Sequence, residues 1–113
     1  MVPSAAGAVV LVPFPFSDLS HSKLRPVVVL ADAGRGDWIL CQITSKTYAD
    51  ARAVPIENAD FQRGSLRLQS YARPGKLFTA HQQLIVAEAG QLKAASFSRV
   101  LDAVVALLRP SPT

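Results

Sequence analysis

The stretch PVVVLADAGRGDWILCQIT, residues 26–44, decides the fold. Its first part, Pro26–Ala31, is a continuous run of β-branched and other apolar residues, which is typical of a strand buried on both faces. Residues 32–36 supply a turn with two glycines, and Trp38–Thr44 is a second apolar run. The stretch therefore predicts an antiparallel β-hairpin with its turn centred near residues 33–34.

Further strands flank this hairpin on both sides. Ala8–Phe14 is rich in β-branched residues and ends in prolines, which predicts a strand, and the polar stretch Ser17–Lys23 predicts a loop. Three weaker strand candidates follow the hairpin: Ala53–Ile56, Ser65–Ala72 and Leu84–Glu88.

The last segment changes its period. Apolar residues between Phe97 and Leu108 recur at steps of three and four, which indicates a helix, with Ser96 as its N-cap and Pro110 as its stop. Several short strands followed by one C-terminal helix predict a mainly β domain built on a strongly bent sheet or barrel. A β-sandwich is the alternative.

Length and composition describe one compact domain. The 113 residues fit a single hydrophobic core, which we expect over residues 7–108 between short tails. Apolar residues make up 50% of the chain and charged residues 18%, unlike chains that stay disordered. The longest apolar stretches fall short of a membrane span, and no secretory leader opens the chain. We therefore expect a cytoplasmic protein that does not enter a membrane.

The sequence contains few residues that could bind a metal ion or take part in redox chemistry. Cys41 is the only cysteine and lies in an apolar run, so it is expected to be a buried structural thiol. The two histidines, His21 and His81, are far apart in the sequence, and the carboxylates are scattered singly. The sequence predicts neither a metal site nor a cofactor.

Positive charge is concentrated in one region. The net charge is +4, and residues 63–76 contain four basic side chains and no acid. This concentration favours a phosphate-binding face, although a solvated basic surface would have the same composition.

The hairpin brings one basic residue close to a hydroxyl. In an antiparallel hairpin with this turn, Arg25 lies across from residues 42–44, so that Arg25 and Thr44 can meet at its open end. Pro26 biases Arg25 toward an extended conformation, and a guanidinium can hold a phosphate through two hydrogen bonds. The pair therefore predicts a phosphate site, provided that the register does not slip by one residue.

Four blocks of the sequence resemble the MazF/PemK family of toxin ribonucleases from bacterial toxin-antitoxin modules, most of all its PemK-like branch. The blocks are VVLVPFPFSDL (residues 9–19), KLRPVVVL (23–30), ILCQITS (39–45) and SYARPGKLFT (70–79). The resemblance implies an SH3-like curved β-barrel that forms a homodimer and cleaves single-stranded RNA without metal. It also implies a cognate antitoxin protein that covers the RNA groove, and DNA binding together with that antitoxin.

The resemblance also implies roles for particular residues. Arg25 and Thr44 match the catalytic arginine and threonine of the family, and Ser45 would substitute for Thr44 if the alignment shifted by one. The RNA-binding positions are Lys23, Lys46, Ser70 and Arg73. Attack of the RNA 2′-OH on the adjacent phosphorus would give a 2′,3′-cyclic phosphate and a 5′-OH end. The unperturbed pKa of histidine suits proton transfer, which makes His21 a possible catalytic residue, but a solvated loop histidine is the interpretation that the sequence favours.

Two non-catalytic functions are compatible with the same fold. A barrel of this kind can act by binding a protein, as gyrase-poisoning toxins do, but the end of the chain, residues 107–113, has no aromatic anchor for such a contact. A nucleic-acid-binding module without catalysis needs an aromatic stacking face, and the 7% of aromatic residues are scattered.

Overall fold

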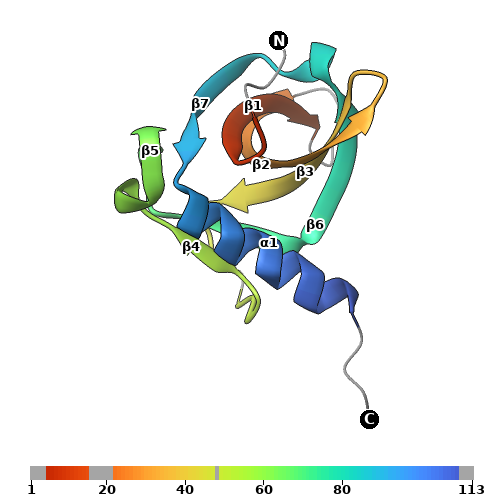
Figure 1. Ribbon diagram of the computed structural model, residues 1–113. Coiled ribbons are helices and arrows are strands. Elements are labelled where there is room, and N and C mark those ends of the chain that lie inside the picture. Colours follow the sequence, from red (N-terminus) through yellow and green to blue (C-terminus); the bar gives the residue numbers. More distant parts are fainter. Residues whose placement is uncertain (1–4, 16–21, 48, 110–113) are drawn as a thin grey trace.

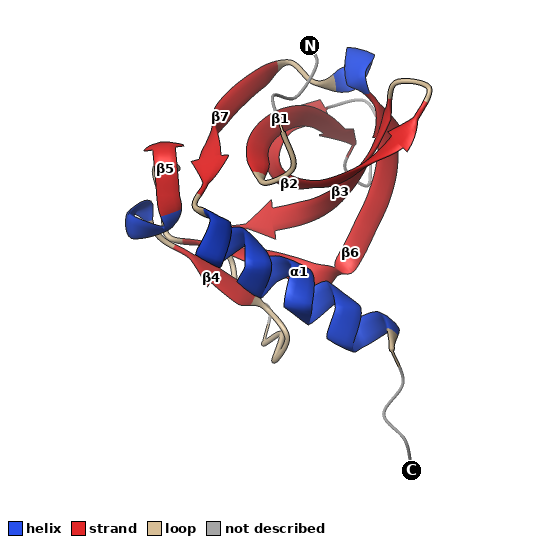
Figure 2. Ribbon diagram, in the orientation of Figure 1, coloured by secondary structure: helices blue, strands red, loops and turns tan. Residues whose placement is uncertain are grey.

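The computed structural model describes residues 5–15, 22–47 and 49–109. That part of the chain forms one sheet of seven strands, two short 3-10 helices and one C-terminal α-helix (Figures 1 and 2). The strands are β1 (Ala8–Pro15), β2 (Ser22–Gly34), β3 (Asp37–Thr44), β4 (Val54–Ile56), β5 (Phe61–Gly64), β6 (Ser70–His81) and β7 (Ala87–Leu92). The helices are η1 (Asn58–Asp60), η2 (Gln82–Leu84) and α1 (Ala94–Leu108).

The sheet is antiparallel and strongly curled. Its strands follow the order β4-β6-β3-β2-β1-β7-β5, so that the predicted hairpin of β2 and β3 lies in the middle. Figure 1 shows the strands winding around a common interior, with α1 lying across one end beside β4 and β6. The predicted bent sheet with a C-terminal helix is therefore confirmed.

The turn between β2 and β3 lies two residues later in the sequence than predicted. Strand β2 continues to Gly34, and Arg35 and Gly36 form the turn with φ angles of 59° and 82°. A Cβ on Gly36 would lie 2.6 Å from Nε2 of His81, so this turn packs closely on the end of β6. A residue with positive φ and no room for a side chain must be glycine.

Two irregularities in β2 compensate for the displaced turn. The register shifts between Val29 and Ala31 and again between Asp32 and Gly34. Each shift is a bulge, which leaves a residue of one strand unpaired. Beyond both bulges Val27 lies opposite Gln42, which is the register that the sequence required for Arg25 and Thr44 to face each other.

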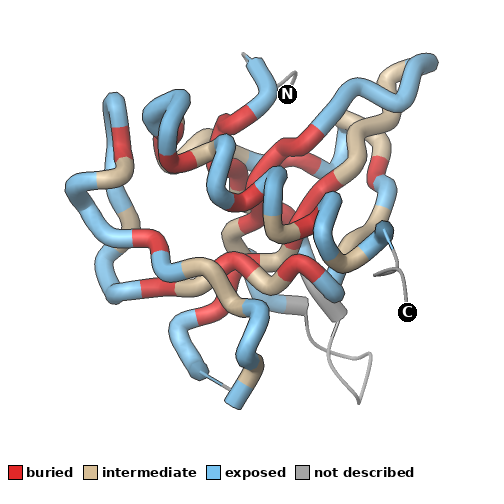
Figure 3. The backbone as a smooth tube through the Cα atoms, turned by 60° about the horizontal axis from the view of Figure 1, so that its bottom comes forward, coloured by how far each residue is buried: buried red, intermediate tan, exposed pale blue. Residues whose placement is uncertain are grey.

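The core lies on both faces of the central strands (Figure 3). Val28 belongs to one cluster of buried apolar residues, whereas Val27 and Val29 belong to the other. The first cluster also includes Val100 and Val104 of α1, so the helix covers that face of the sheet. Since side chains alternate between the faces of a strand, the continuous run of valines is explained by burial on both faces, as predicted.

Several predicted boundaries are wrong. The strand predicted over Pro26–Ala31 is longer and runs over Ser22–Gly34. The strand predicted over Ser65–Ala72 begins only at Ser70, because β5 ends at Gly64 (φ 76°) and the segment 65–69 is irregular, with Leu68 64% exposed. The strand predicted over Leu84–Glu88 begins later, at Ala87. The loop predicted over Ser17–Lys23 is shorter at its end, because β2 already begins at Ser22.

The helix begins in a different way from the prediction. Its N-cap is Lys93, and Ser96 is the third residue of the helix. There the Ser96 hydroxyl donates to Oδ1 of Asp60 at 2.9 Å, so it joins α1 to η1 and does not cap the helix. The helix ends at Leu108, and the predicted stop, Pro110, lies outside the described residues. No helix in the described ranges is long and apolar enough to cross a membrane.

Candidate functional site

A groove opens where β2 and β3 separate. Their ladder ends at Val27, opposite Gln42, and the preceding residue, Pro26, has no N–H to donate to a neighbouring strand. Residues 22–26 remain paired with β1, whereas β3 continues beside β6 as far as Thr44. The divergence leaves a groove of about 580 Å³, which is completed by the segment 65–69 and the start of β6.

Arg25, from β2, and Thr44, from β3, both line this groove. The two strands are paired as far as Val27 and Gln42, and Arg25 and Thr44 lie two residues beyond that pair, where the strands separate. Thr44 is only 5% exposed, and its Oγ1 accepts a hydrogen bond from the Lys46 N–H at 3.1 Å. This bond fixes the hydroxyl oxygen, and the hydroxyl still has one hydrogen to donate.

Three more of the residues singled out in the sequence line the same groove: Lys23, Ser45 and Ser70. Lys23 and Ser45 are exposed. Ser70 is buried, and its hydroxyl donates to the Leu68 carbonyl oxygen at 2.9 Å, which ties the segment 65–69 to the start of β6.

The other candidates lie elsewhere. Arg73 does not line the groove: its Nε donates to Oδ2 of Asp50 at 3.2 Å, and its carbonyl oxygen accepts from the Cys41 thiol at 3.3 Å. Lys46 is exposed beyond the end of β3 and contacts the site through its backbone N–H. His21 lies outside the described residues.

Sequence reasoning missed the wall formed by Leu66, Arg67 and Leu68. Arg67 belongs to the acid-free basic run over residues 63–76, but the alternation of its segment predicts a strand and does not place Arg67 at the site. The run itself was the signal, since it brings one more cation to the groove.

The groove is positively charged. Lys23, Arg25 and Arg67 line it, and the described residues around it include no Asp, Glu or His. Such a surface attracts phosphates and raises their local concentration. An arginine in it can bind one phosphate through two charge-assisted hydrogen bonds.

An ionised carboxylate supports the segment that follows β3. The Arg52 backbone N–H and the Arg73 guanidinium both donate to Asp50, and they lower the pKa of its carboxyl below the usual value. The Asp50–Arg73 ion pair thereby joins this segment to β6. Thr44 ends β3 and Ser45 begins this segment, so the ion pair supports one wall of the groove.

Cys41 takes no part in this chemistry. Its side chain is fully buried, and burial raises the pKa of its thiol to about 12, so that the thiol stays protonated. The predicted structural role is confirmed. Across residues 5–15, 22–47 and 49–109, no three His, Cys, Asp or Glu side chains lie close enough together to hold a metal ion.

The sequence matches one protein-family model over residues 5–108. The model describes the PemK-like, MazF-like toxin of type II toxin-antitoxin systems. A comparison with curated protein sequences finds no match.

Solved structures share the fold at low sequence identity. MazF in a MazE-MazF complex from Deinococcus radiodurans superposes with a TM-score of 0.76 at 18% identity, over 98% of this chain and 99% of that one. An endoribonuclease in complex with its cognate antitoxin, from a mycobacterial species, gives 0.69 at 17% identity, over 99% and 100%. The Mycobacterium tuberculosis toxin MazF-mt6 gives 0.65 at 16% identity, over 88% and 95%. The curled sheet with its C-terminal helix is thus the fold of these proteins.

Proposed function

Since the chain belongs to the PemK-like, MazF-like toxins of type II toxin-antitoxin systems, we propose that it is an endoribonuclease that cleaves single-stranded RNA without a metal ion. The observation that carries the proposal is that Arg25 and Thr44 line one groove, together with further cations and with no described carboxylate. A groove of this charge favours a polyanion, and its open shape admits an extended strand.

RNA contains its own nucleophile, the 2′-OH. The 2′-OH attacks the adjacent phosphorus, a new P–O2′ bond forms, and the bond from phosphorus to the 5′-oxygen of the next nucleotide breaks. The products are a 2′,3′-cyclic phosphate and a 5′-OH end. The proton lost by the 2′-OH is balanced by the one gained by the leaving 5′-oxygen. The protein therefore has to orient the strand and stabilise the charge that develops on phosphorus.

Arg25 and Thr44 suit these two tasks. The Arg25 guanidinium can donate two hydrogen bonds to the phosphorane oxygens. Thr44, whose oxygen is fixed by the Lys46 N–H, can donate its hydroxyl hydrogen to a non-bridging oxygen. Lys23 at the groove, and Lys46 and Arg73 beside it, are proposed to add contacts or charge for the flanking phosphates.

Proton transfer needs a further group, because an arginine seldom gives up its proton. His21 precedes Arg25 in the sequence and is the proposed candidate. Ser45 and Ser70, which line the groove, can orient the RNA or a water molecule.

The proposal extends to the partners of the chain. The structures of similar fold include a MazE-MazF complex and an endoribonuclease bound to its cognate antitoxin. By analogy, an antitoxin would inhibit this protein by covering the groove, and the complex would bind DNA. We also propose that the toxin is a cytoplasmic homodimer.

A cleavage assay in EDTA tests the proposal. Purified protein is incubated with a long single-stranded RNA, and the cut sites and end groups are mapped for the wild type and for Arg25→Ala. Selective cuts that carry 5′-OH ends and disappear in the variant support the mechanism. A folded wild-type protein that leaves the RNA intact would contradict it.

A further inference from the structure

We propose that a pocket beside the groove binds one unpaired RNA base and prefers a base that carries an amino group. This inference rests on the proposed endoribonuclease activity, because it names the part of the substrate that is read there. The pocket has a volume of about 240 Å³. Sites for drug-sized ligands measure roughly 300–1,000 Å³, so this pocket suits a single ring-sized group.

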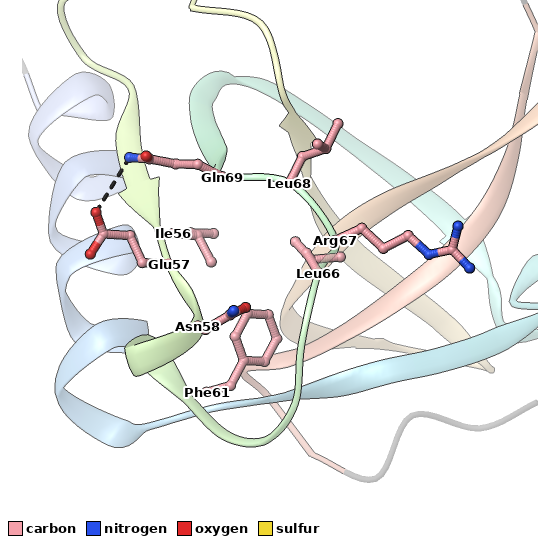
Figure 4. Close-up of a pocket in the computed structure, with 8 residues that line it drawn as sticks. All are labelled: Ile56, Glu57, Asn58, Phe61, Leu66, Arg67, Leu68 and Gln69. Carbon is pink, nitrogen blue, oxygen red and sulfur yellow. Dashed lines mark hydrogen bonds between the residues drawn. The ribbon is translucent and has the colours of Figure 1, made fainter.

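The pocket and the groove share one wall. Leu66, Arg67 and Leu68 line both of them, so the segment 65–69 is all that separates the two. Figure 4 shows the Arg67 side chain extending away from the pocket, on the other side of this segment. A phosphate bound by Arg25 and Arg67 in the groove therefore leaves the neighbouring base within reach of the pocket.

The lining of the pocket fits a base. Its apolar lining consists of Ile56, Phe61, Leu66 and Leu68. Ile56 and Phe61 are 2% and 7% exposed, whereas Leu68 is 64% exposed. Three exposed polar side chains border it: Glu57, Asn58 and Gln69 (Figure 4). Single-stranded RNA is recognised in this way, with the faces of its bases against apolar or aromatic side chains and their edges hydrogen-bonded to polar ones.

The apolar part of the pocket is held in place before any ligand binds. Gly90 packs so tightly on Phe61 that a Cβ there would lie 2.8 Å from a carbon of the ring. Such packing fixes the ring, so a bound base would not have to order it.

The polar border is also fixed, through hydrogen bonds. Nε2 of Gln69 donates to Oε1 of Glu57 at 3.4 Å, and the Glu57 N–H donates to Asp60 at 2.8 Å. Asp60 in turn accepts from Ser96 in α1. The border thus stands in a defined place relative to the helix.

Charge decides which part of the nucleotide enters. The Glu57 carboxylate repels a phosphate and accepts hydrogen bonds from amino groups such as N4 of cytosine, while the amides of Asn58 and Gln69 can pair with the edge of adenine. Uracil presents carbonyl oxygens where these bases carry an amino group. The pocket should therefore favour cytosine or adenine over uracil.

Cleavage of a randomised RNA pool tests the assignment. Cut sites are sequenced in EDTA for the wild type, Glu57→Gln, Asn58→Ala and Gln69→Ala. The matched control is Gln83→Ala, whose exposed side chain lies in η2 near the hairpin turn. We expect the wild type to favour amino-bearing bases at one position near the cut by roughly tenfold, and each pocket variant to reduce that preference. The control should retain it.

Binding separates failure of the pocket from failure of the enzyme. Oligocytidine and oligouridine with 2′-O-methyl groups lack the nucleophile, and each is titrated into labelled protein while the side-chain amide signals of Asn58 and Gln69 are recorded. Shifts with oligocytidine that exceed those with oligouridine support the pocket even if the wild type cuts nothing. An active enzyme whose base preference is the same in all pocket variants, or amide signals that neither oligomer moves, would overturn it.

Discussion

Arg73 donates from Nε to Oδ2 of Asp50 at 3.2 Å, and this ion pair joins β6 to the segment that follows β3. Arg73 is therefore part of the support of the groove, outside its lining. The segment that follows β3 begins at Ser45 and contains Lys46, whose N–H donates to the Thr44 hydroxyl oxygen. Arg73 and Asp50 are thereby linked to the site through the backbone.

The ion pair predicts a non-additive effect on cleavage. If Arg73 acts by holding Asp50, Arg73→Ala and Asp50→Ala lower kcat by similar factors, and the double variant loses no more than either single one. A direct phosphate contact by Arg73 would instead raise KM in Arg73→Ala alone. Steady-state cleavage of a short RNA by the three variants distinguishes the two roles.

Loss of the Arg25 guanidinium should remove most of the activity. Removal of one preorganised charge-stabilising donor costs about 100- to 1,000-fold in rate, so Arg25→Ala should fall in that range. Arg25→Lys keeps the charge but loses the two-pronged geometry, and it should recover part of the rate. Arg109→Ala, an equal loss of charge at the exposed end of α1, is the control. Single-turnover rates equal to the wild type in Arg25→Ala would remove this residue from the mechanism.

Two glycines with similar backbone angles should differ in their tolerance of alanine. Gly64 and Gly34 have φ angles of 76° and 89°, so a side chain strains both. Only at Gly64 would the added Cβ collide with the backbone of Ala89, because nothing lies within 4 Å of a Cβ on Gly34. Urea unfolding should therefore show Gly64→Ala to be less stable than Gly34→Ala by about 1 to 3 kcal/mol. Equal losses would mean that backbone strain is the whole effect.

Much of the fold was predictable because the strongest signals are local. The valines of β2 and the helical spacing after Phe97 identify their elements without knowledge of the partners. The turn at Arg35 and Gly36 was displaced in the prediction because bulges in β2 depend on pairing with β3, which no local pattern records. The register at the open end was right only because these bulges offset that error.

The candidate site was predictable in part. The hairpin register and the family resemblance each predict that Arg25 and Thr44 belong to one site. The register predicts it because Arg25 and Thr44 lie on two strands that are neighbours in the sequence. The positions of Arg67 and of the pocket beside it are set by the path of the irregular segment 65–69. Its alternating leucines looked like a strand, so tertiary packing was needed to show which residues it contributes.

The Cys41 thiol should resist modification in the folded protein. Its side chain is fully buried in the folded protein, and this burial raises the pKa of the thiol to about 12. At pH 8 almost none of the thiol is therefore in the reactive thiolate form. A thiol reagent such as a disulfide dye should react at the rate of unfolding in native buffer and at once in denaturant. Fast reaction of the native protein would show that the strand opens locally.

Acid should remove the contribution of Asp60 to stability. Partial burial alone would raise the pKa of this carboxyl, but hydrogen bonds from the Glu57 N–H, the Ser96 hydroxyl and the Arg99 guanidinium lower it below its usual value. A carboxyl whose pKa is lowered by folding stabilises the native state above its unfolded pKa, about 3.9, and ceases to do so as the pH falls through the folded value.

The size of this contribution follows from a comparison of Asp60→Asn with the wild type across pH. At pH 7 the variant should lose about 1 to 2 kcal/mol in the free energy of unfolding, because the amide cannot replace the charge-assisted bonds to Arg99 and Ser96. Below pH 4 the gap should narrow, since the wild-type carboxyl becomes protonated as well. Asp102→Asn, at an exposed position of α1, serves as the control for a change of net charge. A gap between Asp60→Asn and the wild type that stays constant from pH 7 to pH 3 would mean that the shape of the side chain, and not its ionisation, holds η1 against the helix.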